Sequence, residues 1–277
     1  LVVGSQATDV GVVTHAAALS GRTGQPILQW TGSDPGDGFG GSVARAGDVN
    51  LDGIPDIAIG SPWGAPVGGT PYWGAPTWGK VDLFSGANGA LLWSQDGNHG
   101  QHPPPWGDGY SCGAALTSVG DQDSDGIPDL LVGCPTSYPL VPFPTPIPGY
   151  WAYHARGAIH LLSGASGHRL RIITPQDPQA AHFGRRMCVI DRFLLVSAPH
   201  TYPSAGAVYV LDLKSGAQLD RCLGEEEGDQ LGLALATGRL RDGTPVVAIT
   251  APVAGPGPVW PFAPVNGPGQ VYLYTLR

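Results

Sequence analysis

Positive charge is scarce in this chain of 277 residues. Lys80 and Lys214 are its only lysines, and lysine and arginine together number 14 against 22 acidic residues, so the formal net charge is −8. A nucleic-acid-binding surface needs clustered basic side chains to neutralise phosphates. We therefore expect no nucleic-acid partner.

Long apolar runs are also missing. No segment approaches the roughly 20 apolar residues that a helix needs to cross a bilayer, so we expect no membrane span. The segment Leu1-Val2-Val3-Gly4 lacks the charged and apolar regions of a signal peptide. If the protein is exported, we expect its signal to lie outside this sequence.

The sequence offers little that indicates catalysis. His99 and His102 lie in a Gly- and Pro-rich segment, and no catalytic motif supports them or the isolated His154, His168, His182 and His200. The four cysteines have no zinc-ligand spacing. We therefore predict a protein that is not an enzyme and has no catalytic residues. A polysaccharide lyase or hydrolase, with a site assembled at a channel mouth, is kept as an alternative.

Glycine and proline are abundant, with 43 and 28 residues, while 42% of the chain is hydrophobic. The hydrophobic residues form short Val/Ile/Leu-rich runs between Gly/Pro clusters. That pattern is typical of many short strands joined by turns. The chain is therefore expected to fold, and to fold mainly as β-sheet.

An internal repeat determines the predicted architecture. Residues 39–62 and 112–135 match closely, and each is followed by a Gly-x-x-x-x-x-Ser-Gly element, at 79–86 and 157–164. Weaker copies cover 182–212 and 230–274, and a partial copy covers 1–24. Each full copy supplies four short strands. A sandwich would not repeat the same loop signature at the same place in each unit.

Four-stranded units of this kind bury both faces by stacking radially around an axis, as propeller blades do. We predict an all-β fold, a single β-propeller domain over residues 1–277, with about five blades visible. The predicted blades are a partial blade 1–33 and blades 34–98, 99–178, 179–226 and 227–277. The chain is expected to begin at the second strand of one blade and to end at the third strand of another. Open strand edges would then be available to a neighbouring copy, unless the chain is a fragment or these terminal assignments are out of register.

Two acidic loops have the spacing of a calcium site. Side chains at positions 1, 3, 5 and 9 supply oxygen ligands, a glycine at position 6 permits the bend, and a backbone carbonyl at position 7 completes the shell. The predicted ligands are Asp48, Asn50, Asp52, Ile54 and Asp56 in the first loop, and Asp121, Asp123, Asp125, Ile127 and Asp129 in the second. We predict two structural Ca²⁺ ions. The alternative is a solvated acidic turn, although its carboxylates would repel one another.

The later copies lack this ligand set. Asp191 in one and Asp242 in the other are the only carboxylates left in the corresponding loops. No calcium site is predicted there.

These motifs together resemble a known repeat. Phe-Gly, then Gly-Asp-x-Asn/Asp-x-Asp-Gly-x-x-Asp, then an apolar triplet with Gly-x-Pro, is similar to the FG-GAP repeat of integrin α subunits and of many bacterial surface proteins. The resemblance implies an extracellular or cell-surface, calcium-binding propeller acting in adhesion, recognition or self-assembly. Integrin-type propellers have seven blades, and their calcium loops lie opposite the main ligand-binding face.

Aromatic residues gather in the loops between the second and third strands of the units, and in one connection between units. Such loops suit protein contacts or stacking against sugar rings. The candidate ligand-binding residues are Trp63, Trp73, Trp78, Trp106, Trp151 and Trp260. The partner could be a protein, a glycan or a second copy of the chain that builds a homo-oligomer or filament. A lectin-like propeller is an alternative, and so are loops that pack on themselves.

The cysteines give one further expectation. Cys112 and Cys134 occupy the positions of Phe39 and Ser61 at the ends of neighbouring strands, so a cross-strand disulfide is predicted between them. Cys188 and Cys222 are expected to pair less easily.

Overall fold

A computed structural model describes residues 1–4, 14–33, 36–63, 78–97, 111–137, 156–201, 205–252 and 269–276. The chain divides into two compact units, one formed by Leu1–Val141 with Ala158–Ile173 and the other by Pro142–Gly157 with Thr174–Arg277. The described residues form strands and no helix, and hence no helix long and apolar enough to cross a membrane.

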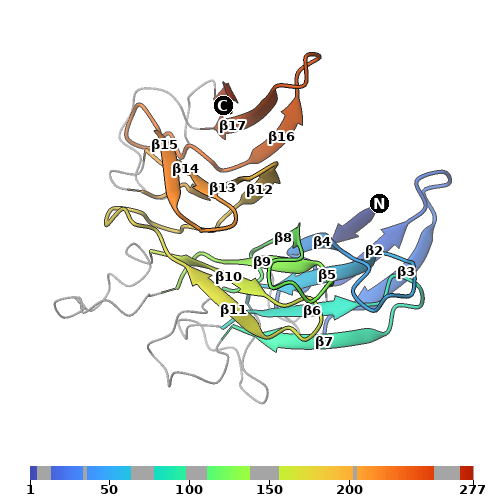
Figure 1. Ribbon diagram of the computed structural model, residues 1–277. Coiled ribbons are helices and arrows are strands. Elements are labelled where there is room, and N and C mark those ends of the chain that lie inside the picture. Colours follow the sequence, from blue (N-terminus) through green and yellow to red (C-terminus); the bar gives the residue numbers. More distant parts are fainter. Residues whose placement is uncertain are drawn as a thin grey trace. The chain divides into compact units, whose positions relative to one another are not determined.

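The first unit contains three antiparallel sheets, drawn from blue to yellow-green in Figure 1. The first sheet consists of β1 (Val2–Gly4), β2 (His15–Leu19) and β3 (Pro26–Thr31). The second sheet consists of β4 (Ser42–Gly47), β5 (Asp56–Ser61), β6 (Lys80–Phe84) and β7 (Leu91–Asp96). The third sheet consists of β8 (Ala115–Gly120), β9 (Asp129–Cys134), β10 (Ala158–Leu162) and β11 (Arg169–Ile173).

The second unit contains two more sheets of the same kind. One has β12 (Met187–Ile190), β13 (Phe193–Ala198), β14 (Ala207–Asp212) and β15 (Gln218–Leu223); the other has β16 (Leu235–Arg239), β17 (Pro245–Ala251) and β18 (Gln270–Thr275). In every sheet, strands consecutive in sequence pair with each other. Five up-and-down sheets of three or four strands confirm the predicted all-β fold built from propeller blades.

The second strand of each four-stranded sheet is buried along its whole length. Strands β5, β9 and β13 are buried at every residue. The fourth strands β7 and β15 are largely exposed. A strand covered on both faces reads as a continuous apolar run, and the sequences Asp56–Ser61 and Asp129–Cys134 show such a run.

Side chains from adjacent sheets form the cores within each unit. In the first unit, Val81 and Leu83 of β6 pack with Leu130 and Val132 of β9. In the second, Leu195 of β13 packs with Val247 and Ile249 of β17. Each sheet therefore shares its core with its neighbour.

Glycines mark the places where backbones of neighbouring sheets meet. Gly79 forms a parallel bridge with Cys112, and Gly206 forms the equivalent bridge with Leu231. Gly79 has φ +70°, and a Cβ atom there would lie closer than 3.0 Å to the backbone of Cys112. The glycines before β6, β10 and β14 (Gly79, Gly157 and Gly206) are therefore required by close packing as well as by conformation.

Candidate functional site

The two acidic loops occupy the same place in adjacent sheets of the first unit. One joins β4 to β5, and the other joins β8 to β9. Both have a left-handed residue at position 4, Leu51 (φ 61°) and Ser124 (φ 70°), and both have a glycine with φ 87° at position 6, Gly53 and Gly126. The repeated sequence therefore gives a repeated backbone.

In the first loop, the carboxylates turn inward to accept backbone hydrogen bonds. Asp48 accepts N–H bonds from Asp52 at 3.0 Å and from Gly53 at 2.9 Å. The side-chain amide of Asn50 donates through Nδ2 to the Asp52 carboxylate at 2.9 Å. Asp52 also accepts a hydrogen bond from the backbone N–H of Ile54. Three of the predicted ligand side chains are thus held by the loop itself.

The second loop repeats this arrangement. Asp121 accepts N–H bonds from Ser124 at 2.6 Å and from Gly126 at 2.9 Å. Asp125 accepts from the N–H of Ile127 at 2.8 Å. Carboxylate oxygens of Asp121, Asp123 and Asp129 lie within 4.8 Å of one another. This grouping places three of the predicted acidic ligands around one point.

The carboxylate at position 9 anchors each loop to its sheet. One Asp129 oxygen accepts from the N–H of Gln122 at 2.7 Å, and the other accepts from the N–H of Gly164 at 3.0 Å. Asp56 repeats both contacts, with the N–H groups of Val49 and Gly86. Gly86 and Gly164 close the repeated Ser-Gly elements; the pattern was visible in the sequence, but the role of these N–H groups was not predicted.

Two carboxyl groups of the second loop have pKa values shifted in opposite directions. Hydrogen bonding, chiefly from the N–H of Gly126, lowers the pKa of the exposed Asp121. Burial raises the pKa of Asp129, and the nearby charges of Asp123 and Asp125 raise it further. A buried carboxylate among other carboxylates is stabilised by a cation. The donors are hard oxygens, so the set fits Ca²⁺ in preference to a thiophilic ion.

The later hairpins are stabilised differently. Asp191, at the turn between β12 and β13, forms an ion pair with Arg239 of β16. The turn between β16 and β17 carries Asp242, which accepts a hydrogen bond from the N–H of Thr244 at 2.9 Å. The single carboxylates of these two turns are thus satisfied by partners within the protein.

Two of the six candidate tryptophans lie among the described residues. Trp78 is only 3% exposed, so the expectation that its ring faces a partner is corrected: it packs into the protein just before β6. Trp63 is partly exposed and lies against Gly38. Trp73, Trp106, Trp151 and Trp260 lie outside the described residues.

Two further tryptophans, not singled out from the sequence, link neighbouring sheets of the first unit. The indole N–H of Trp30 on β3 donates to the carbonyl of Gly89 at 3.0 Å, and that of Trp93 on β7 donates to the carbonyl of Gly164 at 2.6 Å. Both bonds run from the last strand of one sheet to the turn between the third and fourth strands of the next sheet.

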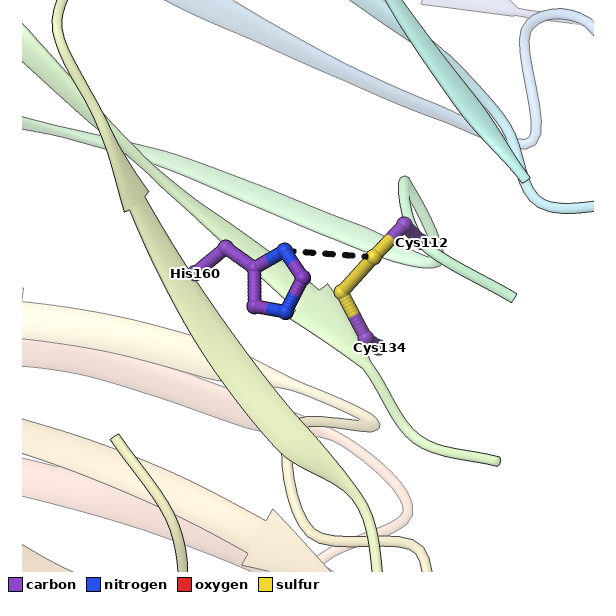
Figure 2. Close-up of side chains that lie close together, drawn as sticks. All are labelled: Cys112, Cys134 and His160. Carbon is purple, nitrogen blue, oxygen red and sulfur yellow. Dashed lines mark hydrogen bonds between the residues drawn. A yellow bond between two sulfur atoms is a disulfide. The ribbon is translucent and has the colours of Figure 1, made fainter. Parts of the chain in front are cut away.

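The cysteines divide into a bonded pair and two free thiols. Cys112 and Cys134 form a disulfide, and His160 of β10 lies beside it (Figure 2). Cys188 and Cys222 are free. Burial raises the pKa of Cys188 to about 12 and also raises that of Cys222, so both stay protonated and unreactive at neutral pH.

One short motif was overlooked in the sequence. Residues 109–113 read Gly-Tyr-Ser-Cys-Gly, which fits the Gly-x-Ser-x-Gly pattern of α/β-hydrolases. That motif needs a turn from a strand into a helix. Ser111 instead precedes strand β8, and its hydroxyl accepts a hydrogen bond from Thr136 at 2.7 Å. Ser111 therefore does not lie in the strand-to-helix turn that this motif requires.

Comparison with known proteins supports the resemblance seen in the sequence. No protein-family model matches the chain. Curated relatives include mouse (Mus musculus) integrin α-IIb, 35% identical over 39% of this chain; human integrin α-7, 29% identical over 67%; and mouse integrin α-8, 38% identical over 47%. The chain matches only 9, 14 and 11% of their respective lengths. These similarities confirm the predicted relationship to integrin α propellers.

Proposed function

We propose that the chain is a calcium-stabilised, extracellular β-propeller module for adhesion or recognition, without catalytic activity. The observation that carries the proposal is the acidic hairpin loop, which recurs with the same backbone in two adjacent sheets. The relatives named integrin α subunits support a role in adhesion.

In each loop, the ion would be held by the oxygen donors of the predicted set. These are Asp48, Asn50, Asp52, Asp56 and the carbonyl of Ile54, and Asp121, Asp123, Asp125, Asp129 and the carbonyl of Ile127. Bound Ca²⁺ supplies positive charge that offsets repulsion among the carboxylates. The loops themselves orient their carboxylates through hydrogen bonds from backbone N–H groups.

The proposed role of the ions is structural. Each loop joins the first two strands of a sheet, and the second strand is buried at every residue. Fixing the hairpin therefore fixes the register of this buried strand. We further propose that the five sheets are blades of one propeller, with the boundaries predicted from the repeat.

The proposed partner is a protein, which includes a second copy of this chain. The last strand, β18, has exposed Val271 and Leu273 (71% and 64%) and pairs on one side with β17. Exposed strand edges can accept an added strand. The lectin-like alternative depends mainly on tryptophans outside the described residues and stays a prediction.

Calcium titration tests the proposal. Calorimetry of the metal-stripped chain is expected to show two Ca²⁺ ions bound, and Ca²⁺ is expected to raise the melting temperature. At a free concentration of about 100 times Kd, one site adds about 2.7 kcal/mol to the free energy of unfolding.

The matched variants are Asp123→Asn with Asp125→Asn in the second loop, and Asp242→Asn as a control outside both loops. The loop variant is expected to bind one ion, and the control to bind two. Equal binding by all three proteins, or no binding by the parent, would overturn the proposal.

A further inference from the structure

A second group of potential metal ligands lies at the other end of β9. This strand begins at Asp129, in the acidic loop, and ends at Cys134. Five steps along a strand cover about 17 Å, so the two places are chemically separate. Around the far end, Cys112, Cys134 and His160 are brought together from three segments (Figure 2).

All three side chains are buried. Cys112 is 2% exposed, and Cys134 and His160 are 0% exposed. The Sγ atom of Cys112 lies 3.7 Å from Nδ1 of His160. One ligand atom from each of the three residues lies within 4.8 Å of the others. Burying an imidazole on an apolar strand is costly unless it has a specific partner.

The other sheets show that the fold does not need these residue types. Strand register makes Phe39, Ser61 and Asp82 equivalent to Cys112, Cys134 and His160. In the fourth sheet the equivalent residues are Phe183, Ala198 and Tyr209, and the rings of Phe183 and Tyr209 pack edge to face at 5.6 Å.

In the fourth sheet aromatic and small side chains fill these positions, and in the second sheet they are filled by Phe39, Ser61 and the buried Asp82, which pairs with Lys80. Only the third sheet has sulfur, sulfur and imidazole at all three. This joint replacement indicates a shared chemical role, since packing alone is met by ordinary core residues.

The geometry suits a soft metal ion. Zn²⁺ lies about 2.3 Å from thiolate sulfur and about 2.0–2.1 Å from imidazole nitrogen. Tetrahedral or trigonal angles at the ion then place sulfur and nitrogen roughly 3.6–3.8 Å apart. The separation of 3.7 Å between Cys112 Sγ and His160 Nδ1 falls in that range while the disulfide is intact, and the Cys112–Cys134 bond must break before both sulfurs can reach an ion.

We propose that Cys112, Cys134 and His160 form a redox-gated site for one thiophilic metal ion, Zn²⁺ or Cu⁺. In the oxidised chain the sulfurs are bonded to each other and the site is closed. A dithiol reductant opens it: the reductant gives two electrons and two protons, the Cys112–Cys134 bond breaks, and the reductant becomes a disulfide. Binding of the ion then displaces the two thiol protons.

A bound ion would also balance the charge of the thiolates that form in the buried site after reduction. Thiolates in a buried site are disfavoured unless a cation balances them. With two thiolates and one neutral imidazole, Zn²⁺ neutralises the site, and Cu⁺ reduces its charge to −1. Thiolate donors select Zn²⁺ or Cu⁺ over the hard ions that suit the acidic loops.

The test uses the full chain with Cys188→Ser and Cys222→Ser, which removes the two free thiols. The protein is reduced with a phosphine, which does not add competing thiols, and is titrated with Co²⁺ as a spectroscopic substitute for Zn²⁺. A thiolate-to-cobalt charge-transfer band is expected at one equivalent in the reduced protein and not in the oxidised protein. Co²⁺ bound through oxygen in the acidic loops gives no such band.

Two variants identify the ligands. Cys112→Ser with Cys134→Ser is expected to abolish the band. His160→Phe, which places an aromatic residue where the fourth sheet has Tyr209, is expected to weaken Co²⁺ binding roughly tenfold or more and to alter the band. A band unchanged in His160→Phe would overturn the three-ligand site.

Separate titrations with Zn²⁺ and with Cu⁺, against chelators of known affinity, distinguish the two ions. The proposal is supported if the reduced protein binds either ion more tightly than the oxidised protein does. It is overturned if neither ion shows such a difference. If reduction unfolds the chain, recovery of the β-sheet circular dichroism on adding either ion supports the site. Failure to recover it with both ions counts against the site.

Discussion

The N–H group of Gly164 donates a 3.0 Å hydrogen bond to the carboxylate of Asp129, 35 residues earlier in the chain. Asp129 closes the acidic loop before β9, and Gly164 lies in the turn after β10. A single buried carboxylate thus joins two turns at the same end of one sheet. Asp56 and Gly86 form the same pair in the preceding sheet.

The first prediction concerns that carboxylate. Asp129→Asn replaces one accepting oxygen with an N–H₂ group, which faces a backbone donor and cannot accept from it. Leaving a buried donor unsatisfied costs about 1–3 kcal/mol, so we expect a loss of that size in the free energy of unfolding, measured by urea denaturation without calcium. Asp123→Asn in the same loop is exposed and is expected to change stability by less than about 0.5 kcal/mol. Equal losses in the two variants would contradict the anchoring role.

The second prediction concerns pH. Burial raises the pKa of Asp129 above its ordinary value of 3.8. The folded state therefore holds its proton more tightly than the unfolded state, and the contribution of Asp129 to stability falls as the pH rises from 3.8 through the raised pKa. Ca²⁺ favours the ionised form and reverses this loss.

We expect the gain in melting temperature on adding Ca²⁺ to increase with pH across that window and then to level off. In the Asp129→Asn variant the increase is expected to be smaller. Melting curves with and without Ca²⁺ at several pH values measure it. The same pH dependence in both proteins would assign it to other groups.

The third prediction tests the close approach of neighbouring sheets. Gly79 and Gly24 have nearly the same backbone, with φ +70° and +69°. A Cβ atom at Gly24 meets nothing within 4 Å, whereas one at Gly79 meets the backbone of Cys112. Gly24→Ala is therefore expected to cost only the conformational penalty of about 1–2 kcal/mol.

Gly79→Ala adds a clash with backbone that cannot move aside without breaking the bridge to Cys112. We expect it to cost more than about 4 kcal/mol, in the range of exceptional single substitutions, or to prevent folding. Urea denaturation of both variants gives the comparison. Similar costs at the two sites would show that the sheets can separate there without penalty.

The fourth prediction concerns the ion pair between Asp191 and Arg239. Both side chains are about half exposed, 46% and 49%, so water and salt screen their attraction. A double-mutant cycle with Asp191→Asn and Arg239→Gln is expected to give a coupling free energy of about 1 kcal/mol or less. The coupling is expected to shrink at high salt; a large, salt-independent value would show that the pair is shielded from solvent.

The repeat in the sequence was sufficient to predict the strands and the acidic hairpins. Short apolar runs bounded by glycine and proline have one stable arrangement, an antiparallel sheet with tight turns, and this signal is local. The loop at 121–129 is local too, because its ligand spacing lies within nine residues. The side-chain contacts of Asp121 and Asp125 inside that loop follow from the same short segment.

Contacts between distant segments were decided only by tertiary structure. Trp78 was expected to face a partner because its loop is aromatic, yet packing against the sheet buries it. The sequence separates His160 from Cys112 by 48 residues, and no local pattern links the two. Pairing of β9 with β10 and the approach of Cys112 to Gly79 bring the two together. The sequence by itself determined where each strand and hairpin lies, because strands and hairpins depend on neighbours along the chain. Which side chains meet between strands depends on strand register and on packing between sheets. Register and packing exist only once the chain has folded.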